Sequence, residues 1–169
     1  LRLTNRNYLS SNEGYFDIVL KQVNPGQVDF LYAGGRYVIK LDTFFLSEHL
    51  DYSYSKDTST YGMERIPPQY IGALTKQNDI LKLDFGEPVP LGGEPVISGT
   101  SGTLVARIKF YNPDLYSTSC LLEEQFQWIT WSPEEFTQLY YRRNGITVPI
   151  NNNNSSFSTY ELCISTLCC

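Results

Sequence analysis

A single histidine, His49, restricts the nucleophilic chemistry that is open to this chain. A Ser-His-Asp or Cys-His arrangement needs a base beside the nucleophile, so any such site would have to use His49. The chain has no nucleophile-elbow glycine pattern, no Gly-x-Gly-x-x-Gly sequence and no Walker-type loop. A lone histidine is typical of a surface or loop position. We therefore predict no catalytic site built on it.

The four cysteines do not have the spacing of a metal site. They are Cys120, Cys163, Cys168 and Cys169. Zinc ligands usually come in pairs about two to four residues apart, with a second pair well separated from the first. Because the chain lacks this pattern, we predict no metal and no cofactor. Two states stay open for the thiols: buried free cysteines on a terminal strand, or one disulfide between Cys120 and a C-terminal cysteine.

Paired carboxylates are the remaining route to catalysis. Glycoside hydrolases on sandwich folds place two acids across a cleft. The acids that we expect to face outward on strands include Glu123 and Asp84, with Glu124 on the face opposite Glu123. Outward acids on an antiparallel sheet more often simply solvate its exposed face. A carboxylate-dependent hydrolase is therefore the third of three functional hypotheses.

A polar segment at 51–61 contains three tyrosines among serines, threonines and aspartates: Tyr52, Tyr54 and Tyr61. Tyrosine with serine is the composition that binding loops favour, because a rigid amphipathic ring gives a large contact area at a small entropic cost. We predict a loop whose tyrosines contact a partner. The alternative is a long loop whose tyrosines pack back on the fold.

The run Asn-Asn-Asn-Asn-Ser-Ser at 151–156 holds two overlapping acceptor sequences for N-linked glycan, at Asn153 and Asn154. They would be used only if a eukaryote secretes the protein. The alternative is a bare polar loop between two strands.

The elements that position these residues have a period of two rather than 3.6. Alternating apolar and polar residues predict half-buried strands. The predicted strands are residues 15–23, 28–32, 36–46, 80–85, 103–111, 121–131, 146–150 and 157–168. The first three are expected to form a meander, with a break at 33–35. Residues 69–75 are expected to be a brief helical or irregular piece.

One short helix is predicted near 133–143. Ser132 would cap it, and a proline and a glutamate follow at the first and third helical positions. Three apolar residues then recur at helical spacing: Phe136, Leu139 and Tyr140. The Asn-Gly pair at 144–145 would supply the left-handed stop.

Together these elements predict an all-β fold, an antiparallel β-sandwich of jelly-roll or Greek-key type with about eight strands. A chain of 169 residues can bury roughly 70% of its unfolded surface in one core, so residues 1–169 are expected to form a single domain. No apolar run is long enough for a membrane helix, so no membrane insertion is expected. The first residue is Leu1, which indicates a processed product or a fragment.

Charge and composition favour function by contact. The chain has 13 basic and 18 acidic side chains and a net charge of −5, which disfavours nucleic acid as a partner. Residues 157–169 carry one charge, Glu161, so this segment must be covered by the sandwich or by a neighbouring subunit. The preferred hypothesis is a non-enzymatic structural protein that self-associates or joins a larger assembly, such as a capsid, coat or surface appendage, in a virion or outside the cell. The second is a carbohydrate- or ligand-binding module.

Overall fold

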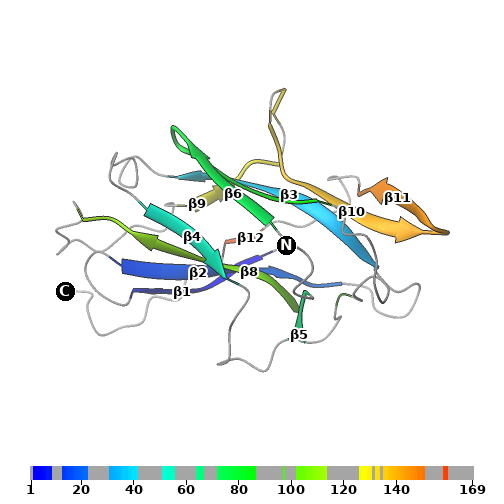
Figure 1. The fold of residues 1–169 in the computed structure, drawn as a ribbon, viewed down its shortest axis with the longest axis horizontal. Helices are drawn as coiled ribbons and strands as arrows, with labels where there is room; N and C mark the ends of the chain where they lie inside the picture. The colour runs from blue at the N-terminus through cyan, green and yellow to red at the C-terminus, as the bar shows by residue number, and fades with distance from the viewer. Residues whose placement is uncertain are drawn as a thin grey trace.

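The computed structural model describes residues 2–8, 13–22, 31–41, 51–55, 64–66, 72–86, 97, 102–113, 126–130, 132–133, 135–150 and 158–159. These residues form twelve strands in two sheets of six, and they include no helix. The sheets pack against each other as a β-sandwich (Figure 1), so the predicted all-β fold is confirmed. No described segment could cross a membrane as a helix.

The first sheet has the strand order β12-β1-β2-β8-β4, with β5 beside β8. Its strands are β1 (Arg2–Tyr8), β2 (Glu13–Leu20), β4 (Asp51–Ser55), β5 (Glu64–Arg65), β8 (Thr103–Tyr111) and β12 (Ser158–Thr159). The second sheet has the order β11-β10-β3-β7-β6, with β9 beside β3. Its strands are β3 (Tyr32–Leu41), β6 (Gly72–Gln77), β7 (Ile80–Phe85), β9 (Phe126–Trp128), β10 (Gln138–Arg143) and β11 (Ile146–Pro149). Among the described strand pairs, only β1–β12 and β5–β8 are parallel.

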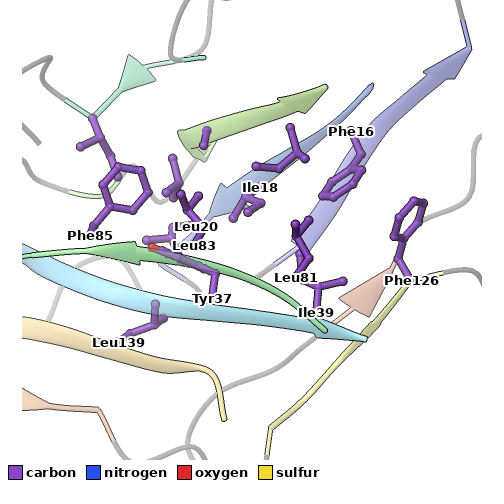
Figure 2. Packing of buried hydrophobic residues seen from close by; sticks show 14 of the residues in the cluster. Phe16, Ile18, Leu20, Tyr37, Ile39, Leu81, Leu83, Phe85, Phe126 and Leu139 are labelled. Atoms are coloured by element: carbon purple, nitrogen blue, oxygen red, sulfur yellow. The ribbon is translucent and has the colours of Figure 1, made fainter. Parts of the chain in front are cut away.

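The core lies between the two sheets and follows from the period-two pattern of the strands (Figure 2). On β3 the inward side chains are apolar, whereas Arg36 and Lys40 between them are exposed. Full burial of one large apolar side chain contributes about 1.5–3 kcal/mol, so this cluster is the main source of stability. Its members include Phe16, Ile18, Leu20, Tyr37, Ile39, Leu81, Leu83, Phe85, Phe126 and Leu139.

The middle of the first sheet is buried on its outer face as well. Asp17 on β2 points away from the core, yet it is only 1% exposed. Its carboxylate accepts two hydrogen bonds from Arg107 on β8, at 2.7 and 2.9 Å. The Arg107 guanidinium also lies 3.9 Å from the centre of the Tyr15 ring. This two-bond ion pair offsets the cost of burying both charges.

The predicted meander is wrong. Strand β2 lies in the first sheet between β1 and β8, whereas β3 lies in the second sheet between β10 and β7. The predicted break at 33–35 is also wrong, because β3 continues through it. Gly34 has φ +117°, and a Cβ there would lie 2.8 Å from the carbonyl oxygen of Phe85. The glycine therefore permits a close backbone approach within the strand instead of ending it.

The predicted helix near 133–143 is wrong too, because Gln138–Arg143 is strand β10 and forms a hairpin with β11. Asn144 and Gly145 have φ +52° and +77°, and two positive φ values define a type I′ hairpin turn. The Asn-Gly pair therefore closes a hairpin and does not end a helix. Phe136, which belongs to the apolar stripe of the predicted helix, is 38% exposed.

Between β9 and β10 the chain leaves the second sheet and returns to the same edge of β3. The Val38 carbonyl still accepts from the Ile129 N–H at 3.0 Å, and the Thr137 hydroxyl adds to this pairing: it donates to the same carbonyl at 3.1 Å and accepts from the Val38 N–H at 3.0 Å. The Thr137 N–H donates to the carbonyl of Ile129 at 2.7 Å and so joins the two ends of the segment that leaves the sheet. We call the segment between Ile129 and Thr137 the excursion. Glu135 within it accepts a 2.8 Å hydrogen bond from Lys82 on β7.

The strands predicted at 80–85 and 103–111 are confirmed with the same bounds as β7 and β8, and that at 146–150 corresponds to β11. The irregular piece expected at 69–75 is wrong where the structure describes it, since Gly72–Gln77 is strand β6. Most of the strands predicted at 28–32, 121–131 and 157–168 lies outside the described residues. The single domain over 1–169 stays a prediction.

Candidate functional site

The predicted tyrosine loop is a strand where the structure describes it. Tyr52 and Tyr54 lie on β4, half-buried, and both pack against the core. Apart from Asp84, the other candidate site residues lie outside the described residues: Tyr61, Asn153, Asn154, His49, Glu123, Glu124 and all four cysteines. Their roles stay predictions.

Tyr54 joins the two sheets at one side of the sandwich. Its hydroxyl donates to the carbonyl of Gly72 at 2.6 Å and accepts from the Gly72 N–H at 2.9 Å. Gly72 opens β6, the edge strand of the second sheet, so the phenol satisfies an edge position that a neighbouring strand would otherwise fill. The Tyr54 ring also packs edge-on against Phe85, with centroids 6.0 Å apart. These contacts give Tyr54 a structural role, because they hold the two sheets together.

Tyr52 differs from Tyr54 in its hydroxyl. The Tyr52 hydroxyl is buried and has no hydrogen-bond partner in the described part of the chain. Burial raises the pKa of this phenol, because an ionised oxygen would be poorly solvated there. A side chain held in this way contributes contact area to the core and offers little to an external partner.

The outer face of the second sheet carries ion pairs. Asp84 on β7 accepts a 2.8 Å hydrogen bond from Arg36 on β3, and this bond raises the pKa of the guanidinium. Lys82 pairs with Glu135 at 2.8 Å. Each of these carboxylates is held by a cation, which is the arrangement of a solvated sheet face. The described residues contain no group of His, Cys, Asp or Glu side chains that could hold a metal ion.

An open hollow of about 370 Å³ lies on this outer face, beside the Gly34 position of β3. Its size falls within the range of small-molecule sites. Polar groups converge on it from three strands, and one tyrosine adds an aromatic face. The lining residues are Ala33, Gly35, Arg36, Asp84, Phe85, Gly86, Tyr140 and Thr147.

The β10–β11 hairpin is the second surface feature, and its turn lies at one end of the long axis of the molecule (Figure 1). We call residues 142–146 the hairpin tip. Ile146 in the tip is 66% exposed, although it is a large apolar side chain. It pairs across the hairpin with Arg143, and Arg142 donates to the carbonyl of Gly145 at 3.2 Å. Arginine and tyrosine are the residue types that dominate binding at protein interfaces, and Tyr140 and Tyr141 stand below the tip.

The edge of this hairpin is protected against strand addition. In a two-residue hairpin the residue pair next to the turn, here Arg143 and Ile146, exchanges two backbone hydrogen bonds, and hydrogen-bonded and non-hydrogen-bonded pairs then alternate. Thr147 and Pro149 are in non-hydrogen-bonded pairs, so their backbone groups point away from β10. The bond from the Ile150 N–H to the Leu139 carbonyl, at 2.8 Å, fits this alternation. Pro149 has no N–H to donate to a new strand. The hairpin is therefore suited to contact through its side chains.

Comparison with known proteins adds no family to this description: no protein-family model, curated protein or solved structure matches the chain.

The signal for the hairpin is nevertheless present in the sequence. An Asn-Gly pair between residues 138–143 and 146–149, both rich in strand-forming residues, is the strongest short-range hairpin pattern. The Asn-Gly pair was interpreted as the end of a helix, so the hairpin was not predicted.

Proposed function

We propose that this chain is a non-enzymatic assembly protein that acts through protein–protein contacts, with the hairpin tip as its contact element. The observation that carries the proposal is the exposure of Ile146, at 66%, beside Arg143 on the same face of the hairpin, with Arg142 next to it on the opposite face. Burial of one isoleucine in a partner contributes about 1.5–3 kcal/mol, and arginine adds directional hydrogen bonds around it. The I′ turn fixes the tip before binding, which lowers the entropic cost of association.

A photo-crosslinking residue at position 146, introduced into the chain in its native source, tests this proposal. We expect covalent adducts with a defined partner, and we expect Arg142→Ser together with Arg143→Ser to abolish them. The matched control is the same probe at Gln77, which is exposed on the edge strand β6 and should give no such adduct. Equal labelling at positions 146 and 77, or no adduct at 146, would contradict a contact role for the hairpin tip.

The second candidate is a ligand-binding module, as the hollow on the second sheet supports it. The hydrogen-bonded pair of Arg36 and Asp84 presents planar polar groups beside Tyr140, a combination that suits a polar ring such as a saccharide. A glycan array tests it: binding that Tyr140→Ala removes would support this role. Because Asp84 and Glu135 are each tied to a cation, this face favours binding over hydrolysis.

A further inference from the structure

We propose that the partner of the hairpin tip is a second copy of the same chain, contacted at the opposite end of the molecule. The docking surface is a row of three side chains on the outer face of the first sheet, which we call the acidic row: Glu13, Tyr111 and Asp51. The inference rests on the contact role proposed above and adds the identity of the partner to it.

The strand register builds the acidic row. Tyr111 on β8 pairs with Glu13 on β2 and with Asp51 on β4, so the three residues lie side by side across three strands. All three face away from the core, because their neighbours Phe110 and Tyr52 pack into it. Both carboxylates are exposed, and Tyr111 is 43% exposed between them.

The two surfaces lie at opposite ends of the sandwich. Figure 1 shows the β10–β11 turn at one end of the long axis, while β2 and β4 begin, and β8 ends, toward the other. An exposed apolar or aromatic side chain marks each end: Ile146 at one, Tyr111 at the other. A contact between them joins successive copies along the long axis.

The chemistry of the two surfaces is complementary. The hairpin tip places Arg143 beside Ile146 on one face, with Arg142 on the opposite face, and the acidic row places two carboxylates on either side of a tyrosine. The rest of the chain is more acidic than its net charge of −5 indicates, since the tip contributes two positive charges. The acidic remainder of one copy therefore attracts the basic hairpin tip of another copy and repels that copy's acidic surface. Lys109, exposed on the same face two residues before Tyr111, is the cation that opposes this attraction.

Because the two surfaces differ, the contact is heterologous and does not close on itself as a two-fold dimer. Heterologous contacts produce rings or open rows of subunits. The purified chain should therefore form a concentration-dependent series of oligomers. The ion pairs are exposed, so raising the salt to about 0.5 M should shift the series toward monomer.

Sedimentation velocity on the purified full chain tests the inference with two variants. The first, Arg143→Ser with Ile146→Ser, removes the tip and keeps the acidic row. The second, Glu13→Gln with Asp51→Asn and Tyr111→Ser, removes the row and keeps the tip. Each variant alone should be monomeric, and an equimolar mixture should stop at a 1:1 dimer, because only one contact is left. Lys109→Glu should lower the concentration needed for oligomers about threefold or more, and unchanged melting curves would show that the variants fold.

Three results would overturn the inference: a wild-type chain that stays monomeric at every concentration in low salt, a wild-type species that stops at dimer, or a mixture that does not associate. None of these decides the proposed function, because the crosslinking experiment at position 146 reports a partner of any identity. A chain that is monomeric alone but crosslinks to another protein in its native source would keep the contact role and reject self-association. Adducts between two copies of this chain, with the second copy joined through the acidic row, would support both.

Discussion

At the scale of single residues, Tyr52 and Tyr54 on one strand provide an internally controlled experiment. Tyr54→Phe removes both hydrogen bonds to Gly72 and leaves two backbone groups of an edge strand without that partner. We expect a loss of about 1–3 kcal/mol in the free energy of unfolding. Tyr52→Phe removes a buried hydroxyl with no described partner, so it should be neutral or stabilising. Urea denaturation midpoints measure both, and equal losses would show that the two phenols do not differ as described.

The buried ion pair of Asp17 and Arg107 should contribute more to stability than the exposed pair of Asp84 and Arg36. Asp17→Asn leaves Arg107 buried without its carboxylate, which should cost about 3–5 kcal/mol. Asp84→Asn breaks a pair whose side chains are 45% and 36% exposed, and it should cost less than about 1 kcal/mol. Thermal unfolding of the two variants compares them directly. A larger destabilisation from Asp84→Asn would indicate that the outer face of the second sheet is covered.

At the scale of elements, the I′ turn should depend on Gly145. Gly145→Ala places a Cβ on a residue with φ +77°, and the left-handed conformation costs a residue with a Cβ about 1–2 kcal/mol. Gly86→Ala is the matched control, because it also has open space around it but no positive φ. We expect faster hydrogen exchange in β10 and β11 for the first variant and no change for the second. Unchanged exchange in Gly145→Ala would contradict the turn type.

The elements also show what the sequence can and cannot predict. Strands β7 and β8 were predicted with their observed bounds, because charged side chains alternate with apolar ones over most of each strand: Lys82 and Asp84 in β7, Arg107 and Lys109 in β8. The position of β2 beside β8 could not be predicted, because this pairing depends on contacts between distant segments that no local pattern encodes. The hairpin was missed because the capping serine and the apolar spacing favour a helix, and the Asn-Gly pair fits the end of a helix as well as the turn of a hairpin. Tyr52 and Tyr54 were predicted to lie in a loop and to contact a partner, but they lie on β4 and pack against the core. Their inward direction follows from the pairing of β4 with β8, which no local pattern encodes.

At the scale of the whole molecule, protection against hydrogen exchange should follow position in the sheets. Strands β2, β8, β3 and β7 have neighbours on both sides, whereas β11 and β6 are edge strands in the described topology. Opening an edge strand disrupts fewer contacts, so its amides exchange at a lower free-energy cost. We expect the slowest exchange in the four central strands and the fastest in β11. Uniform protection across the second sheet would indicate that its edges are covered, for example by another copy.

The excursion between β9 and β10 has a consequence for how this fold can diversify. Its base is closed by the Thr137 hydroxyl on Val38 and by the bond from Thr137 to Ile129, so the ladder beneath does not depend on what the loop contains. The entropic cost of a longer loop rises only slowly with its length. Segments of other lengths and compositions can therefore be grafted between Ile129 and Thr137 without changing the strand register, although they would remove the ion pair between Glu135 and Lys82. The position is a natural site for inserting a foreign epitope or a reporter peptide into this scaffold.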